Sequence, residues 1–364
     1  MVGNIITPYL RQVVVADGSD LFITYGCSPS LRIESKIVAM DVPPLDENDI
    51  EALVNDLTDE DQRDEFDSTM ELNFAVSLET GERFRVNMFK QKRYTGMVIR
   101  LIKSVIPTFA ELKLPYIYAD FIMQKRGLII MVGSTGSGKS TSLASMIDYR
   151  NINGIGHIVT VEDPIEYYHE HKGCIITQRE IGIDTYSYGI ALKSALRQSP
   201  DMLMIGEIRD RETLENAILF CETGHLVVAT LHANNSNQAI ERIVNLFPEE
   251  QHFQIQTTLS LNLKSIISQR LVEGTANNRV LAYEILINEG LVKNLIEEGK
   301  IRELKEIMEK NIDQGMITFD QCLLKLVESG EVSKEVALKE ADNPSNLRLK
   351  MSQDSILMNE ERNG

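Results

Sequence analysis

The stretch that decides the fold is a glycine-rich run, Gly133-Ser134-Thr135-Gly136-Ser137-Gly138-Lys139-Ser140-Thr141. Its spacing matches G-x-x-x-x-G-K-[S/T], the pattern of a phosphate-binding P-loop. Glycines at alternate positions open the backbone N–H groups to a polyanion and permit the positive φ angles that the wrap requires. Lys139 supplies a charge for the β- and γ-phosphates, and Ser140 offers its hydroxyl to Mg²⁺. We therefore predict that the whole run binds a nucleoside triphosphate.

The sequence on either side of the loop supports this interpretation. Gly127–Val132 is a short apolar run, which is typical of a buried parallel strand. Residues 141–147 have helical character, so the partial positive charge of a helix N-terminus would point at the phosphates. The alternative, a glycine- and serine-rich surface loop, would not require a buried strand before it or a helix after it.

Composition limits the class of protein. A length of 364 residues suits two domains, and the net charge of −17 disfavours a general affinity for nucleic acid or anionic lipid. No apolar run reaches the 18 residues of a membrane span, and the N-terminus lacks the basic start of a signal peptide. Scattered thiols indicate neither a zinc site nor a disulfide framework; they are Cys27, Cys174, Cys221 and Cys322. The sequence predicts a cytoplasmic protein without direct membrane insertion.

Residues 1–102 are predicted to form a small α+β domain. A helical start precedes alternating apolar and polar segments, the period-two pattern of half-buried antiparallel strands. These segments are Leu21–Thr24, Ser30–Val38, Glu71–Glu79 and Glu82–Gln91. The acidic stretch Asp46–Phe66 is interpreted as surface helix, with Leu53, Val54 and Leu57 facing inward. Residues 103–115 form a linker that contains Pro107 and Pro115.

Strand and helix patterns alternate in residues 116–290, which predicts an α/β fold with a mostly parallel sheet and a ligand at its carboxyl edge. The expected strands are Leu128–Val132, His157–Val161, Asp201–Ile205 and His225–Leu231. The expected helices are Lys139–Arg150, Tyr186–Gln198 and Arg211–Glu222. From Glu249 onward the pattern is helical apart from Arg279–Ile287, with C-terminal helices in 291–342 and a flexible tail in 343–364.

Acidic residues follow two of the predicted strands. Met202–Ile205 leads through Gly206 to Glu207, the form of a Walker B element that holds Mg²⁺ beside the P-loop. The other strand ends at Glu162, and Asp163 and Glu166 lie on either side of a proline. Carboxylates so close together repel one another, so a divalent cation or a polarised water is a chemical reason for them; a solvated acidic turn is the alternative.

Histidines flank the last predicted strand, with His225 before it and His232 at its carboxyl end. His232 lies where a γ-phosphate sensor is expected, although single histidines are more often structural and this spacing suits no standard metal motif. His169 and His171 are predicted to be surface residues.

Together these stretches resemble the secretion ATPases. The segments 133–141, 160–167, 203–210 and 223–232 look like the Walker A, Asp, Walker B and His boxes of that superfamily. The segments 83–87, 106–109 and 196–201 resemble the type IV pilus retraction motors of the PilT/PilU group. The resemblance implies a RecA-like P-loop ATPase core, a PAS-like N-terminal domain, ATP and Mg²⁺ as ligands, and a hexameric ring with nucleotide between subunits. The lack of a tetracysteine motif disfavours the assembly branch.

The resemblance also implies roles for individual residues. By position, Glu162 matches the catalytic glutamate, Glu207 the Walker B acid and His232 the His-box residue. Arg83, Arg85 and Arg93 lie where the N-terminal domain directs arginines toward nucleotide, with ordinary surface arginines as the alternative. Arg197 and Arg209 are candidates at the subunit contact. A dry arginine beside the transferred phosphate raises the hydrolysis rate by orders of magnitude.

One segment departs from the PilT pattern. PilT-type motors carry a stretch resembling Ala-Ile-Arg-Asn-Leu-Ile-Arg-Glu, whereas this chain has Leu291-Val292-Lys293-Asn294-Leu295-Ile296-Glu297-Glu298. Both arginines are replaced, and one charge is reversed. The segments 315–322 and 346–349 are closer to the accessory, PilU-like motors, so the resemblance favours that branch.

The sequence thus predicts a Mg²⁺-dependent ATPase that powers pilus retraction and twitching motility. The expected partners are five copies of itself, a PilT-like paralogue and an inner-membrane platform protein, which would place the chain at the cytoplasmic side of the pilus machine. A weakly active scaffold for the paralogue is an alternative. A nucleic-acid translocase on the same core is disfavoured by the acidic balance.

Overall fold

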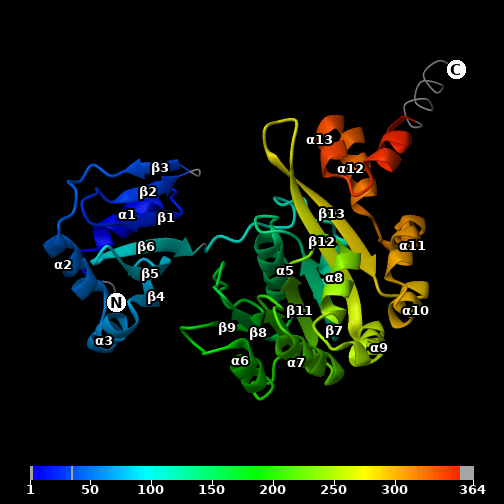
Figure 1. Cartoon of the computed structure of the whole chain (residues 1–364), viewed down its shortest axis with the longest axis horizontal. Helices are drawn as coiled ribbons and strands as arrows, with labels where there is room; N and C mark the ends of the chain where they lie inside the picture. Colours follow the sequence, from blue (N-terminus) through cyan, green and yellow to red (C-terminus); the bar gives the residue numbers. More distant parts are fainter. Residues whose placement is uncertain (1–2, 34–35, 103, 353–364) are drawn as a thin grey trace. The chain divides into compact units, whose positions relative to one another are not determined.

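The structure is a computed structural model that describes residues 3–33, 36–102 and 104–352 of the chain. It divides into two compact units. The first contains residues up to 105 together with 165–168 and 182–186, and the second contains 106–164, 169–181 and the residues from 187 onward. Figure 1 shows both, coloured along the chain.

The first unit is built on a six-stranded antiparallel sheet of order β3-β2-β1-β6-β5-β4. Its strands are β1 (Asp20–Ile23), β2 (Ser30–Ile33), β3 (Lys36–Ala39), β4 (Glu71–Ser77), β5 (Arg83–Gln91) and β6 (Tyr94–Ile102). Buried and half-buried residues alternate along β5, with Phe84, Val86 and Met88 in the core. The predicted period-two pattern is therefore present. We did not predict β6, which closes a hairpin with β5.

Three helices complete the first unit, namely α1 (Thr7–Val15), α2 (Glu47–Leu57) and α3 (Glu60–Thr69). Each acidic helix begins with a capping box, because Asp46 and Asp59 accept hydrogen bonds from backbone N–H groups of the first turn. Leu53 and Leu57 are buried, as the sequence pattern predicts, and the acidic side chains lie outside.

The second unit is built on a seven-stranded sheet of order β13-β12-β7-β11-β10-β8-β9. All neighbours pair in parallel except β12 and β13, which form an antiparallel ribbon. The strands are β7 (Gly127–Val132), β8 (Gly156–Glu162), β9 (Cys174–Glu180), β10 (Met202–Ile205), β11 (Leu226–Leu231), β12 (Leu263–Glu273) and β13 (Arg279–Ile287). The α/β fold with a parallel core is thereby confirmed.

Helices cover both faces of this sheet, as Figure 1 shows. They are α4 (Ile117–Ile122), α5 (Lys139–Asn153), α6 (Tyr188–Ala195), α7 (Arg211–Glu222), α8 (Ser236–Val244), α9 (His252–Asn262), α10 (Leu291–Glu297), α11 (Leu304–Lys310), α12 (Phe319–Glu328) and α13 (Lys334–Glu340). Short 3₁₀ turns lie at Glu249–Gln251, Ile301–Glu303 and Ile312–Gln314. The helical C-terminal region matches the prediction.

Strand β7 shows how the two faces are filled. Leu128, Ile130 and Val132 pack into a core with helices α6 to α11, whereas Ile129 and Met131 pack into a second core with α4, α5, α12 and α13. All are fully buried, which is why this strand is a continuous apolar run rather than an alternating one. The sheet is thereby fixed directly below the P-loop.

The interpretation of residues from Glu249 onward as helical apart from one strand was wrong for β12. This strand contains Ser265, Ser268 and Gln269, all fully buried, which interrupt the apolar run that signals a central strand. Tertiary hydrogen bonds make the burial of two of them favourable: the Ser268 hydroxyl donates to the Glu284 carboxylate at 3.3 Å, and the Gln269 side-chain amide donates to the Ser142 hydroxyl at 3.0 Å. Strand β9 was missed as well, because only Ile176 and its terminal residues are fully buried.

The prediction of a flexible tail in 343–364 was wrong for its first part. Residues 344–352 are helical, and Leu347 and Met351 pack into the core beside α12 and α13. Two leucines and a methionine spread over so few residues gave too little periodicity to detect. Residues 353–364 lie outside the described part of the chain.

Within the described ranges, no helix has both the length and the apolar character that crossing a bilayer requires.

Candidate nucleotide site

The P-loop connects the end of β7 to the start of α5, as the sequence predicts. Gly133 has φ 154°, and a Cβ atom there would lie 2.6 Å from the carbonyl oxygen of Gln269 on β12. The neighbouring backbone therefore requires a glycine at this position. Gly138 precedes the first turn of α5 in a left-handed conformation, and Ser140 is exposed in that turn. The free N–H groups of a helix start thus face the same side as the loop.

Lys139 folds back over its own loop. Its ammonium group donates to the carbonyl oxygens of Gly133 at 2.8 Å and Ser134 at 3.0 Å. Partial burial lowers the pKa of Lys139, and the nearby Glu207 carboxylate opposes that shift. The lysine is thus held above the loop, where a phosphate chain would meet its charge.

Glu207 follows β10 and lies beside Arg209 and His232. Arg209 Nε donates to one of its oxygens at 2.6 Å, and His232 Nε2 lies 3.3 Å from the other. Arg209 also pairs with Asp163 at 2.9 Å, and its hydrogen bond to Glu207 raises the pKa of Arg209. The structure therefore brings three predicted residues, Glu207, His232 and Arg209, into one cluster, with Lys139 close enough to sense its charge.

Glu162 lies at the end of β8 in a different environment. It is 5% exposed and accepts hydrogen bonds on Oε1 from the hydroxyl of Thr160 at 2.7 Å and the side-chain amide of Gln178 at 3.1 Å. Thr160 and Gln178 are direct partners in the β8–β9 register, so both side chains lie on the face from which Glu162 projects. Sequence reasoning missed Gln178, because β9 itself was not predicted.

Gly206 allows the two acidic strand ends to approach each other. A Cβ atom on Gly206 would lie 3.1 Å from the Cα of Glu162 and 2.8 Å from the hydroxyl of Tyr188. That hydroxyl is buried without a hydrogen-bond partner among the described residues. Burial raises the pKa of Tyr188, and the charges of Asp163 and Glu207 contribute. Tyr188 is a further polar group of this site that the sequence pattern did not reveal.

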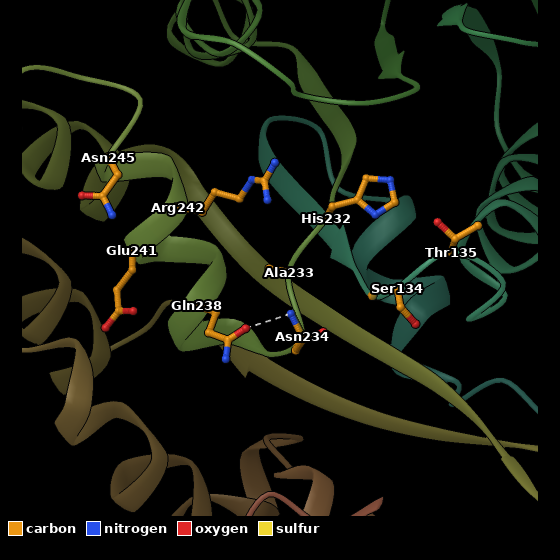
Figure 2. Close-up of a pocket in the computed structure, with 10 residues that line it drawn as sticks. Ser134, Thr135, His232, Ala233, Asn234, Gln238, Glu241, Arg242 and Asn245 are labelled. Atoms are coloured by element: carbon orange, nitrogen blue, oxygen red, sulfur yellow. Dashed lines mark hydrogen bonds between the residues drawn. The ribbon is translucent and has the colours of Figure 1, made fainter.

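A cavity of about 680 Å³ opens beside the P-loop. Figure 2 shows its lining residues, with His232 and the P-loop residues on one side and α8 on the other. The α8 side contributes Gln238, Glu241, Arg242 and Asn245. The volume suits a nucleotide-sized ligand, and the cavity lies at the carboxyl edge of the parallel sheet, as predicted. Arg242 adds a cation to this cavity. No motif spacing in the sequence points to Arg242 as a site residue.

A second cavity of about 620 Å³ shares the P-loop with the first. Its far side is formed by β12 and by residues 339–342 at the C-terminal end of α13. Arg270 ties these parts together, donating to the carbonyl oxygens of Asn234 at 3.2 Å and Glu340 at 2.6 Å and pairing with Asp342 at 2.6 Å. The loop after His232 is thus bonded to the C-terminal helices.

Three of the other predicted arginines belong to the first unit, and the fourth, Arg197, belongs to the second. Arg197 is exposed just after α6, and its side chain has no hydrogen bond or ion pair within the described part of the chain. Arg83 and Arg85 lie on β5 of the first unit, where the Arg83 guanidinium stacks 5.0 Å from the Tyr168 ring. Arg93 is exposed in the β5–β6 turn with φ 76°. Their roles toward nucleotide stay predictions.

The two minor histidines behave differently. His171 is exposed, as predicted, but His169 is 5% exposed, so that prediction was wrong. The turn before β9 folds back onto the sheet, and the His169 backbone N–H donates to the Gln178 side-chain oxygen at 2.8 Å. Burial lowers the pKa of His169 to about 4.

A parallel sheet with a P-loop at its carboxyl edge, a lysine over that loop and an acid just after β10 defines the class of P-loop nucleotide-binding proteins. Comparison with known proteins identifies the family within this class. The Type II/IV secretion system protein family matches residues 4–352. The chain therefore belongs to this family, and within it to the PilT/PilU type of retraction ATPases.

Individual relatives support that placement. The chain is 50% identical over 343 residues to the type IV pilus ATPase PilU of Pseudomonas aeruginosa, covering 93% of this chain and 89% of the relative. It is 39% identical to the retraction ATPase PilT of the same organism, covering 94% and 99%. A crystal structure of the retraction motor PilT with bound ADP matches with a TM-score of 0.88 and 38% identity, covering 96% of this chain and 99% of that one.

Proposed function

We propose that this chain is a Mg²⁺-dependent ATPase of a type IV pilus retraction motor, in the accessory role of a PilU-like protein. The observation that carries the proposal is the cluster of P-loop, Lys139, Glu207 and Glu162 in a chain that is half identical to PilU along nearly its whole length.

The chemistry follows from where the side chains lie. The P-loop amides and Lys139 bind the phosphates, and Glu162, which is buried and held by neutral donors, accepts a proton from the attacking water. His232 and Arg209 hold the Glu207 carboxylate in place. Cationic groups that line the cavity, such as Arg242, offset charge that develops on the γ-phosphate.

The donor set beside the P-loop fits Mg²⁺. The hydroxyl of Ser140 is exposed at the start of α5, and Glu207 presents a carboxylate at the end of β10, so both offer the hard oxygen ligands that Mg²⁺ prefers. Mg²⁺ bound there supplies charge neutralisation for the β- and γ-phosphates. Within the described ranges, no three His, Cys, Asp or Glu side chains form a metal cage, which agrees with an ion that is completed by substrate phosphates.

The assembly is part of the proposal. We infer a homohexamer with nucleotide between subunits, to which Arg83, Arg85, Arg93 and Arg197 contribute from their exposed or N-terminal positions. The ring acts with a PilT-like paralogue on a platform protein at the cytoplasmic face of the inner membrane. Replacement of both arginines of the PilT pattern on α10, by Lys293 and Glu297, supports the accessory assignment.

Substitution of the P-loop lysine tests the proposed site. Lys139→Ala removes the ammonium group that meets the phosphates, and we expect ATP turnover to fall by about 10²–10³-fold while the fold stays intact. Lys310→Ala, which removes an exposed ion pair with Glu306 on α11, is the matched control and keeps wild-type turnover. Normal turnover in Lys139→Ala contradicts the site assignment.

A second experiment separates a motor from a scaffold. A weakly active scaffold for a PilT-like ring is the rival function, because the altered α10 segment sets the chain apart from PilT. ATP turnover is measured for the purified chain alone and mixed with the paralogue, and pilus retraction is scored in cells that carry Lys139→Ala. Full retraction with this variant favours the scaffold. Salt-sensitive DNA binding would instead support a translocase.

A further inference from the structure

The carboxylate of Glu162 is held by a relay of hydrogen bonds that begins in the turn before β9. Oxygen Oε1 accepts from Thr160 Oγ1 at 2.7 Å and from Gln178 Nε2 at 3.1 Å. Both donors are neutral, and both come from the same register position of β8 and β9. Two donors on one carboxylate oxygen fix the rotation of the carboxyl group, so the direction of its other oxygen is fixed as well.

The orientation of the Gln178 amide is set from its other end. The His169 backbone N–H donates to Gln178 Oε1 at 2.8 Å. The reversed amide would place an oxygen against the Glu162 carboxylate and an NH₂ group against the N–H of His169, and both contacts are repulsive. Only one orientation satisfies the network, and in that orientation Gln178 always donates to Glu162.

From this relay we propose that Gln178 is a positioning residue for the proposed base, which holds the Glu162 carboxyl group in the rotamer that meets the attacking water. The proposal rests on the ATPase function proposed above. It explains why a glutamine suits this position, because the side chain must donate on one side and accept on the other. A glutamate would accept on both sides, and a methionine would do neither.

Two substitutions of similar size separate these properties. Gln178→Glu keeps the acceptor for His169 but places a second carboxylate against Glu162, and like charges at this distance repel. Gln178→Met keeps the volume and removes both hydrogen bonds without adding charge. We expect kcat for ATP to fall about 10- to 100-fold in both variants, with KM within about two-fold of wild type, because misorientation of the base affects the chemical step.

The pH profile distinguishes the two variants. The second carboxylate in Gln178→Glu favours retention of a proton on the pair, so the acid limb of the kcat profile moves to higher pH, whereas Gln178→Met leaves it in place. The elements around Glu162 carry other charged or titratable groups, which both variants retain: Asp163, Arg179, Glu180, Tyr188, Glu207 and Arg209. Gln254→Glu adds the same charge on the exposed face of α9 and serves as the control.

A binding measurement makes the test independent of turnover. Calorimetry compares the affinity of each variant for MgADP and for MgADP with aluminium fluoride, a mimic of the transferred phosphoryl group. We expect Gln178→Glu and Gln178→Met to bind MgADP like wild type and to lose about ten-fold or more in affinity for the mimic. Absence of wild-type turnover would contradict the proposed function, while the ratio of the two affinities would still test Gln178.

Two outcomes overturn the inference. One is a kcat and a mimic affinity within two-fold of wild type in both variants. The other is an equal loss of MgADP and mimic binding, which would mean that Gln178 supports the local fold and not the rotamer of Glu162. If Gln178→Glu fails to fold, Gln178→Met and Thr160→Val, which removes the other donor to the same oxygen, give the same readouts.

Discussion

Glu162, at the end of β8, and Glu207, just after β10, are the two strand-end acids of the site, and their side chains have different neighbours. Glu207, after β10, contacts the guanidinium of Arg209 at 2.6 Å and the imidazole of His232 at 3.3 Å. Glu162, at the end of β8, is bonded by the neutral side chains of Thr160 and Gln178. The Arg209 guanidinium offsets the negative charge of the Glu207 carboxylate, whereas the Thr160 hydroxyl and the Gln178 amide orient the Glu162 carboxylate.

This difference separates the two roles that a phosphate-cleaving site requires. In the role that we propose for Glu207, an acid that holds a metal must keep a fixed place, and the contacts with Arg209 and His232 favour this. In the role that we propose for Glu162, a base must keep its direction, and the hydrogen bonds from Thr160 and Gln178 favour this. Sequence alone shows two strand-end acids. Their partners distinguish them.

The largest effect is expected at Glu162. Glu162→Gln retains the shape and the hydrogen-bonding capacity of the side chain but cannot accept a proton, so we expect ATP turnover to fall by about 10³-fold with nucleotide binding unchanged. Single-turnover hydrolysis and ATP-analogue binding measure the two quantities. Glu170→Gln, an exposed acid in the following turn, is the control. Retained turnover in Glu162→Gln would mean that Glu162 is not the base and that its hydrogen bonds with Thr160 and Gln178 have another role.

A smaller and different effect is expected at Glu207. Glu207→Gln removes a charged ligand for Mg²⁺, so we expect the chain to bind nucleotide but hydrolyse it about 10²-fold more slowly at limiting Mg²⁺. Because the defect lies in metal affinity, raising the Mg²⁺ concentration restores part of the rate. A Mg²⁺ titration of turnover in Glu207→Gln and Glu162→Gln sharpens the comparison, since only the first responds. Loss of nucleotide binding would refute the role assigned to Glu207.

Removal of Arg209, the cation between Glu207 and Asp163, tests the contribution of a charged partner to the Glu207 side of the comparison. Arg209→Ala breaks its contacts with Glu207 and Asp163 and leaves the two carboxylates without their shared partner. We expect about a ten-fold loss in turnover, because His232 still holds Glu207. Steady-state kinetics compare this variant with Arg211→Ala, which loses only an exposed ion pair with Glu215 and a contact with the Phe247 ring. Equal kinetics in the two variants would remove Arg209 from the site.

Much of the second unit could be predicted from its sequence because local patterns determine it. The apolar runs of β7, β8, β10 and β11 reveal strands buried on both faces, and the glycine spacing reveals the loop between β7 and α5. Strand β12 has no such local pattern, because it contains the buried polar residues Ser268 and Gln269, whose hydrogen-bond partners lie elsewhere in the chain. Tertiary hydrogen bonds of this kind leave no mark within a short window of sequence.

The residues of the site likewise fall into those that local sequence patterns reveal and those that only the folded chain reveals. Glu162, Glu207 and His232 lie at or just after the ends of predictable strands, and Lys139 belongs to the recognisable P-loop run, so sequence spacing reveals all four. Gln178 and Tyr188 act on them from β9 and α6 through register and close approach, which only the folded chain defines. The roles of Arg83, Arg85, Arg93 and Arg197 toward nucleotide rest on the family resemblance and stay predictions.

His169 is one residue whose burial could not be predicted from the sequence. Its substitution is expected to have the smallest effect of all these substitutions. A histidine in a charged turn is predicted to be exposed, yet His169 is 5% exposed, and burial lowers its pKa to about 4, from 6.5. Because the folded-state pKa is below the unfolded one, the neutral form stabilises the fold above pH 6.5, and that stability is lost as the pH falls toward 4.

Between pH 6.5 and pH 5 the loss amounts to roughly 2 kcal/mol. His169→Phe removes the titrating group and retains the backbone N–H that orients Gln178, so we expect it to flatten this part of the pH dependence. Urea midpoints measured from pH 5 to pH 8 give the slope, and His171→Asn, on the exposed side of the same turn, should keep the wild-type slope. An unchanged slope in His169→Phe would show that the turn opens before its histidine is protonated. The relay to Glu162 would then be less rigid than its hydrogen bonds indicate.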